Sequence, residues 1–314
     1  MWDHPQFKAI LRLPKGFRPA LELTPALAEF YSWPEDIQEA RLTVLTVIGD
    51  AICANEGQLR RYMISKMTAS QTSQHIEYLR KKGFVQRYKC IIDGYNDEDG
   101  EPIKINTPAP INLGPAGYLL LTYLNSARSY MDAEAWIKGN GSSMIQRFVA
   151  ANEIRCKFVE SKIARSWSWY PSFADDGFRR LKKPMAIMGV GEDTEFEDSR
   201  AWMIFERAQL NQNFIGYFKD RLNLYRYLFD KYGYLPVRNY PDDGEKIVVI
   251  SCSTVKIAEA LQEEIGLHKF PFTIWVLIDE WFDTAEDSTD ITKAFASPVK
   301  TPTGYVLRRF KVNL

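Results

Sequence analysis

The sequence contains few residues of the types that hold metal ions or form disulfide frameworks. It has four cysteines and three histidines in 314 residues, and no two cysteines form a CxxC pair. They are scattered along the chain at Cys53, Cys90, Cys156, Cys252, His4, His75 and His268. Zinc sites and disulfide-stapled domains need closely spaced groups of such residues, so the sequence predicts neither. Isolated thiols are typical of proteins in a reducing compartment.

The chain also lacks long apolar runs and an excess of charge of either sign. No stretch approaches the ~18 consecutive apolar residues that indicate a membrane-spanning helix. The start, MWDHPQFKAILRLPKG, lacks the uninterrupted apolar segment of a signal peptide. We therefore expect a cytoplasmic protein. Because 40 basic and 40 acidic residues give a formal net charge of zero, any charge-driven function depends on where the charges cluster.

The length and composition predict two packed domains. A chain of 314 residues with 46% hydrophobic residues can form two cores, because single cores stop growing at roughly 250–300 residues. We expect a proline-punctuated arm over residues 1–36, either irregular or made of short helices that pack on another part of the chain. A first domain is expected over 37–138 and a second over 144–314. The expected boundary between the domains is the glycine-rich segment at 139–142.

The sequence of the first domain predicts three helices followed by a β-hairpin. Apolar residues at helical spacing, small polar helix starts and Gly83 as a helix stop indicate these elements. The expected helices cover residues 37–55, 58–63 and 68–82, and the expected strands cover 84–92 and 103–105. A further helical segment is expected from about 116 to 138. Helix, short helix, helix and hairpin is the element order of a winged helix.

The third of these helices and its surroundings carry residue types that bind DNA. Short hydroxyl and amide side chains let a helix approach the major groove, and Gln71 and Gln74 suit an adenine edge. Residues 56–89 hold eight basic and two acidic side chains, and this local excess of +6 is typical of phosphate contacts. The candidate DNA-binding residues are Arg60, Arg61, Ser70, Gln71, Thr72, Gln74, His75, Arg80, Lys81, Lys82, Arg87 and Lys89.

The turn expected between the two strands carries charge of the same sign as phosphate. Its five carboxylates are Asp93, Asp97, Glu98, Asp99 and Glu101. A turn inserted into a minor groove would bring them close to the DNA backbone. We therefore expect this turn to face away from DNA or to contact a protein.

Beyond residue 143, helical and strand patterns alternate, which predicts an α/β domain with a partly parallel sheet. The expected helices cover 144–165, 214–232 and 254–265. The expected strands cover 167–170, 184–190, 201–206, 246–252 and 272–278. The aromatic cluster over 167–170 could stack on single-stranded bases, but we interpret it as part of the core.

Two resemblances follow from these segments. QLRRYMISKMTASQTSQHIEYLRKKGFVQRYKCI resembles the helix-turn-helix and wing of the MarR- and ArsR-like regulators, over roughly residues 40–107. IQRFVAANEIRCKFVESKIARSW, RLKKPMAIMGVG, RAWMIFERAQLNQNFIGYFKDRLNLYRYLF and EKIVVISCSTVKIAEALQEEI resemble the replication-relaxation family of bacterial mobile elements. That family implies an α+β winged helix followed by an α/β domain with a mixed sheet, restriction-endonuclease-like and related to the PD-(D/E)xK nucleases.

The resemblance implies a nuclease site that this chain has largely lost. Nucleases of that type use two carboxylates to hold a divalent cation and a lysine to stabilise charge. Met185 stands at the first carboxylate position and cannot bind a hard cation, whereas Glu206 stands at the second, followed by Arg207 in place of a spaced lysine. Lys219 and Glu160 are the remaining vestigial candidates. We expect no catalysis, no cofactor and Glu206 paired with Arg207 or a neighbouring lysine.

The function expected from the sequence is that of a non-catalytic DNA-binding protein of a mobile element, acting in plasmid replication, conjugative transfer or their transcriptional control. The expected partners are double-stranded DNA, relaxosome or replication proteins and a second copy of the chain. Two alternatives remain open. One is a Mg²⁺-dependent nickase or endonuclease that uses Glu206, Glu160 and Lys219. The other is an assembly module whose winged helix and acidic turn both bind proteins.

Overall fold

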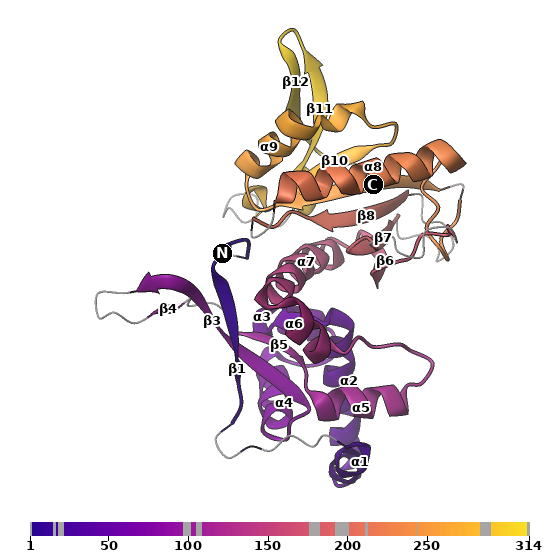
Figure 1. The fold of residues 1–314 in the computed structure, drawn as a ribbon. Helices are drawn as coiled ribbons and strands as arrows, with labels where there is room; N and C mark the ends of the chain where they lie inside the picture. Colours follow the sequence, from indigo (N-terminus) through magenta and orange to yellow (C-terminus); the bar gives the residue numbers. More distant parts are fainter. Residues whose placement is uncertain are drawn as a thin grey trace. The chain divides into compact units, whose positions relative to one another are not determined.

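The computed structural model shows a mixed α/β chain with two sheets, one in each of two compact units, Met1–Cys156 and Lys157–Leu314 (Figure 1). The described residues are 2–14, 17, 22–96, 102–104, 109–175, 183–191, 201–210, 213–242, 244–282 and 290–312. Within those ranges, no helix is both long enough and apolar enough to cross a membrane.

The division between the units falls later than the glycine-rich boundary expected at 139–142. Gly141 has a φ of 78° and separates two helices, α6 (Ala133–Asn140) and α7 (Ser142–Glu160). Because most of α7 belongs to the first unit, this glycine-rich segment is a helix break within that unit.

The helices of the first unit surround one core. They are α1 (Leu23–Tyr31), α2 (Glu35–Ala51), α3 (Glu56–Met63), α4 (Ala69–Lys81), α5 (Pro115–Leu124), α6 and the first part of α7. The three helices expected over 37–82 are confirmed as α2, α3 and α4. Their apolar faces meet in a buried cluster that includes Leu45, Leu59 and Leu79.

The sheet of the first unit is antiparallel and has the strand order β1-β3-β5-β2, with β4 paired to the far part of β3. Its strands are β1 (Phe7–Arg12), β2 (Cys53–Asn55), β3 (Val85–Asn96), β4 (Pro102–Lys104) and β5 (Pro110–Leu113). The expected hairpin is confirmed by β3 and β4. Its acidic turn over 97–101, and the side chain of Asp93, lie outside the described residues.

Three expectations for the first unit are wrong. The helix expected over 37–55 ends at Ala51, and Cys53–Asn55 form the strand β2 instead. The N-terminal arm contains a strand, because β1 pairs with β3 over six residue pairs, although its short packed helix α1, which lies against α5, was expected. The single helix expected over 116–138 is two helices. α5 ends at Leu124, and α6 begins after its N-cap Asp132, whose carboxylate accepts a hydrogen bond from the Ala135 N–H.

The second unit is a seven-stranded mixed sheet in the order β12-β11-β10-β9-β8-β7-β6, of which β8, β9 and β10 are parallel. Its elements are β6 (Ala164–Trp169), β7 (Ala186–Val190), β8 (Ala201–Arg207), α8 (Phe214–Tyr232), β9 (Glu245–Cys252), α9 (Val255–Ile265), β10 (Ile274–Ile278), β11 (Phe295–Thr301) and β12 (Gly304–Phe310). The connecting helices α8 and α9 share one core with the sheet. The expected partly parallel sheet is confirmed.

Differences from the expected elements occur at both ends of this sheet. The helix expected to reach residue 165 ends at Glu160, because Lys162 has a φ of 57° and reverses the chain into β6. The sequence also did not indicate β11 and β12. Trp167 of β6 packs against Trp169 at 5.2 Å and Phe205 at 5.3 Å between ring centroids, which supports the interpretation of this cluster as core.

Gly117 allows α5 to pass close to the start of β3. A Cβ built on Gly117 would lie 2.1 Å from the backbone oxygen of Phe84, whereas one built on Gly139 of α6 meets no atom within 4 Å. We expect Gly117→Ala to lower the free energy of unfolding by about 1–3 kcal/mol through overpacking. Gly139→Ala should raise it by about 0.5–1 kcal/mol through helix propensity. Urea denaturation compares the two, and equal effects would contradict the close packing of α5 on β3.

Candidate nucleic-acid interface

Two capping boxes fix where α3 and α4 begin. At α3, the Asn55 side chain accepts a hydrogen bond from the Gln58 N–H at 2.9 Å, and the Gln58 side chain accepts one from the Asn55 N–H at 3.0 Å. Thr68 and Gln71 form the same reciprocal pair at α4. Each pair satisfies two N–H donors near the helix start. Because the capping box fixes the first residue of α4, it also fixes which side of the helix each following residue occupies.

The first turns of α4 expose most of the side chains expected to meet base edges. Ser70, Gln71 and Gln74 are exposed, and their hydroxyl and amide groups suit base-edge hydrogen bonds. Thr72 differs, because it is fully buried and its hydroxyl donates to the carbonyl of Thr68 at 3.0 Å. It lies on the side of α4 that faces the core, so the structure removes it from the candidate contacts.

His75 lies further along α4 and is half-buried. Burial, and after it the charge of Arg41, lower the pKa of His75 below its ordinary value. A neutral imidazole offers one hydrogen-bond donor and one acceptor. His75 therefore remains a candidate for polar contacts and does not add positive charge at pH 7.

The cations at the end of α4 are held by nearby carboxylates. Arg80 donates to Glu77 from Nε at 2.8 Å and Nη2 at 2.7 Å, and Lys81 lies 3.9 Å from the same carboxylate. The hydrogen bond from Arg80 lowers the pKa of Glu77. Lys82 pairs with Glu29 of α1 at 3.0 Å. The positive charge expected at the end of α4 is thus reduced by two carboxylates, Glu77 of α4 itself and Glu29 of α1.

Glu56 brings together cations from two elements of the first unit. Arg60 of α3 lies 2.6 Å from Glu56, and Arg87 of β3 lies 3.6 Å from its other oxygen. Arg60 also donates to the Ser73 hydroxyl of α4 at 2.8 Å. The two arginine side chains are 44% and 38% exposed, against 16% for Glu56. The guanidinium groups therefore face solvent above a carboxylate that fixes their positions.

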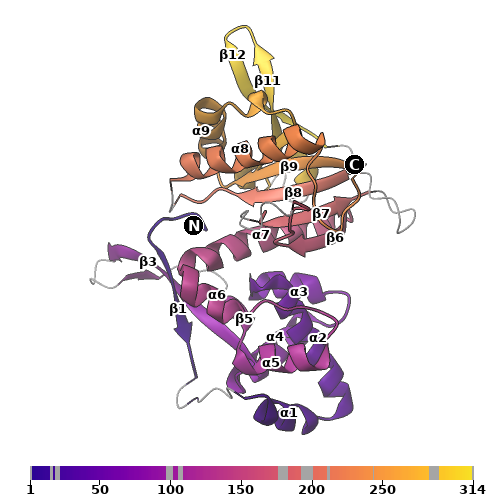
Figure 2. The ribbon, with the colours of Figure 1, turned by 45° about the vertical axis from the view of Figure 1, so that its right-hand side comes forward.

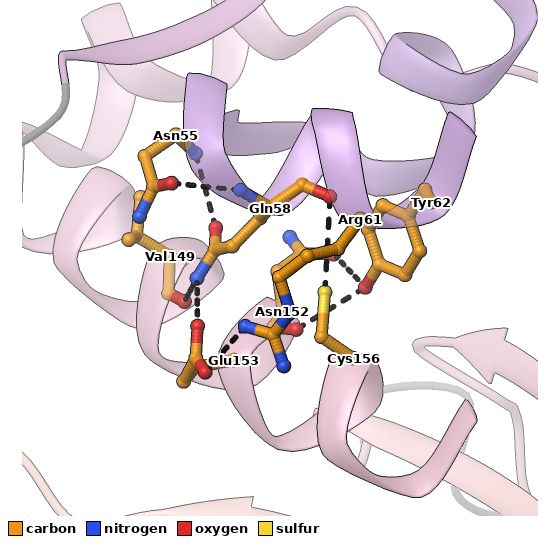
Figure 3. A network of polar contacts seen from close by, with 8 residues as sticks. All are labelled: Asn55, Gln58, Arg61, Tyr62, Val149, Asn152, Glu153 and Cys156. Atoms are coloured by element: carbon orange, nitrogen blue, oxygen red, sulfur yellow. Dashed lines mark hydrogen bonds and ion pairs between the residues drawn. The ribbon is translucent and has the colours of Figure 1, made fainter. Parts of the chain in front are cut away.

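Arg61, by contrast, is engaged with α7. It pairs with Glu153 at 2.6 Å, and Gln58 donates to the same carboxylate at 3.1 Å and to the carbonyl of Val149 at 2.9 Å (Figure 3). These contacts hold α3 against α7. Arg61 therefore serves the fold of the first unit and is a weaker candidate for DNA contact than Arg60.

Asn152 of α7 supports the turn between α2 and β2. Ile52 has a φ of 63° in this turn, and Asn152 donates to the carbonyls on either side of it, Ala51 at 2.8 Å and Cys53 at 3.0 Å. The oxygen of the Asn152 side chain accepts from the Tyr62 hydroxyl at 3.0 Å (Figure 3). One amide thus connects α7 to the segment from which α3 starts.

The paired strands β1 and β3 present a row of cations that the sequence did not indicate. Arg12 pairs with Arg87, and Ile10 pairs with Lys89. Directly paired residues of antiparallel strands project to the same face, as do alternate residues of one strand. Lys8, Arg12, Arg87 and Lys89 therefore share one face of this sheet. We call these four residues together with Arg60 the cationic face.

Lys8 and Arg12 could have been found from the sequence FKAILR, where charged and apolar residues alternate. The two exposed cations flank Ile10, which is 48% exposed. The remaining residues of β1 project to the opposite face, where Phe7 is buried. Such alternation is typical of a strand with one face in solvent.

In the second unit, Glu206 lies fully buried between β8 and α8. It accepts hydrogen bonds from Nε of Arg221 at 2.6 Å and from the Tyr225 hydroxyl. Burial lowers the pKa of Arg221, but the Glu206 charge and hydrogen bond, together with the neighbouring Tyr225 and Tyr217, outweigh this and raise the pKa above its ordinary value. Burial and the Glu206 charge raise the pKa of Tyr225. Arg221 therefore stays cationic and Tyr225 stays a neutral donor.

The expected partner of Glu206 is corrected by this geometry. Arg207 follows Glu206 on β8 and so projects to the opposite face of the sheet, where it pairs with Asp279 at 2.7 Å. The side chain that holds Glu206 comes from α8, at Arg221. The structure therefore has two ion pairs on opposite faces of the sheet, Glu206–Arg221 and Arg207–Asp279, in place of the expected Glu206–Arg207 pair.

The vestigial nuclease candidates do not converge. Lys219 is exposed, whereas the side of α8 that contacts Glu206 is buried. α7 ends against the opposite face of the sheet, where Phe158 contacts Phe205, and Glu160 is exposed there. Within the described ranges, no group of three or more histidine, cysteine, aspartate or glutamate side chains could hold a metal ion.

Comparisons with known proteins do not assign the chain to a family. No protein-family profile matches it, and no curated protein or solved structure shows significant similarity to it.

The contribution of the Glu206–Arg221 ion pair to stability can be measured by removing one or both partners. Arg221→Met leaves a buried carboxylate without its cation, so we expect the free energy of unfolding to fall by about 3–5 kcal/mol. Glu206→Gln/Arg221→Met removes that charge and keeps an acceptor for Tyr225, so it should recover most of the loss. Urea denaturation of both variants measures this, and a double variant no more stable than the single one would show that the pair is not coupled.

Proposed function

We propose that the first unit is a winged helix that binds double-stranded DNA, with α4 in the major groove and the β1–β3 sheet along the phosphate backbone. The observation that carries this proposal is the cationic face, which joins Arg60 beside α4 to four cations on the sheet. Phosphate contacts supply most of the affinity of such proteins and position the reading helix, while base-edge contacts supply the specificity.

The arrangement of α3, α4 and β3 supports this proposal. Arg60 touches Ser73 of α4, and Glu56 ties Arg60 to Arg87 of β3. The exposed start of α4 is therefore linked directly to the cationic face. Since the major groove is ≈12 Å wide and admits one helix, Ser70, Gln71 and Gln74 are the side chains that we propose to meet the bases.

We assign no part of this function to chemistry in the second unit. Glu206 is held by Arg221 and Tyr225, so its carboxylate serves the packing of α8 on the sheet. The resemblance to the replication-relaxation family then suggests the context of the DNA binding, namely plasmid replication, conjugative transfer or their control. The second unit acts in this proposal as a scaffold related to the nucleases.

The proposal predicts a specific change in the salt dependence of binding. Each phosphate contact contributes ≈0.9 to the slope of log K against log salt concentration. We expect Arg12→Ala/Lys89→Ala to weaken binding to mixed-sequence duplex DNA and to reduce the magnitude of this slope by about 2. Fluorescence anisotropy over a salt series measures both quantities.

A matched control removes two cations elsewhere in the first unit. Arg128 pairs with Asp50, and Lys138 pairs with Glu134, which also binds Gln86 on the face of β3 opposite to Arg87. Arg128→Ala/Lys138→Ala should leave the slope nearly unchanged. If both double variants changed the slope equally, the cationic face would have no special role and the proposal would fail.

A further inference from the structure

The hairpin formed by β11 and β12 projects beyond the edge of the second sheet (Figures 1 and 2). Only Phe295 and Ala296 of β11 pair with β10. The five residues from Ser297 to Thr301 pair with β12 alone, which gives a two-stranded ribbon of about 17 Å at 3.4 Å per residue. Most side chains of its outer strand β12 are exposed.

The hairpin is strongly cationic. From Phe295 to Phe310 the chain carries Lys300, Arg308 and Arg309 and no acidic residue. Arg309 stacks on Trp281 at 5.0 Å from the ring centroid. Lys300 and Arg308 are exposed, one on each strand, and neither forms an ion pair with any described residue.

Aromatic contacts hold the hairpin in place. Tyr305 stacks on His268 with ring centroids 3.7 Å apart and an interplanar angle of 4°. At the base, Trp275 contacts Phe295 at 5.6 Å and Phe310 at 5.3 Å. A ribbon held at its base and at Tyr305 loses little conformational freedom when its exposed side chains, Lys300 on one face and Arg308 on the other, meet a partner.

Charged residues on an edge strand can also simply prevent strand pairing between molecules. That role requires charges on the outer strand, which Arg308 and Arg309 supply. It also accounts for Lys300, since β11 is a free edge there, but it does not explain why the ribbon extends past the sheet or why the turn is the polar segment TPTG. A cationic two-stranded ribbon with a polar turn has the size and charge that fit the DNA major groove.

We propose that the β11–β12 hairpin is a second DNA contact, which inserts its ribbon into the major groove of duplex DNA. Lys300 and Arg308 meet phosphates on either side, and the exposed Thr303 of the turn reaches the base edges. The Thr301 hydroxyl instead donates to the Gly304 carbonyl and stabilises the turn. The choice of duplex DNA as the partner rests on the function proposed above, whereas the cationic ribbon is observed independently of it.

A cysteine placed in the turn tests the contact directly in the full chain. All four native cysteines are buried, so Thr303→Cys provides one exposed thiol. We expect saturating mixed-sequence duplex DNA at low salt to slow alkylation of this thiol several-fold. The matched control is Asn223→Cys on the exposed side of α8, whose alkylation should not change. Equal alkylation rates with and without DNA at position 303 would overturn the proposal.

Charge variants separate this inference from the proposed function. Lys300→Ala/Arg308→Ala should reduce the salt slope by about 2, whereas Lys256→Ala on α9 should not change it. If only this pair and not Arg12→Ala/Lys89→Ala alters binding, the hairpin contact stands and the winged-helix proposal fails. If only the cationic-face variant alters binding, the hairpin contact is overturned. Protection of the thiol by polyglutamate but not by DNA would also overturn it, in favour of an acidic protein partner.

Discussion

The side-chain amide of Asn152 is the contact on which the arrangement of the first unit depends. It hydrogen-bonds the two carbonyls that flank Ile52, a β-branched residue with φ 63°. Such a backbone conformation costs of order 1–3 kcal/mol and persists only where surrounding contacts fix it. The turn lets α2 end and β2 begin, and α3 starts directly after β2. The position of Glu56, and through it of Arg60 and Arg87, therefore follows from a buried amide on α7.

Carboxylates organise both units, but with opposite consequences for function. In the first unit, Glu56 is partly exposed and leaves two arginines facing solvent, so positive charge remains available to a partner. In the second unit, Glu206 is fully buried and its cation is only 3% exposed, so that pair stabilises packing and offers nothing to solvent. The degree of burial, rather than the residue type, thus distinguishes a binding surface from a structural ion pair.

The sequence predicted elements whose signals are local. The helix start at Thr68 and the stop at Gly83 placed α4 correctly, and buried apolar runs placed β8, β9 and β10. Asn55, which caps α3, was instead expected inside the preceding helix. The prediction also failed where the partner is distant in the chain. Phe7 pairs with Ile92, Lys82 pairs with Glu29, and Glu206 pairs with Arg221. Periodicity also could not show that Thr72 faces the core, since a threonine suits both a helix surface and a tight contact.

The central claim is that the cationic face of the first unit lies against DNA. Ile10 is the most direct probe, because it lies between Lys8 and Arg12 on β1 and is 48% exposed. A photoreactive benzoylphenylalanine at position 10 should cross-link to duplex DNA, whereas the same group at Tyr123 of α5, which is 57% exposed, should not. Cross-linking from position 123 and none from position 10 would contradict this account.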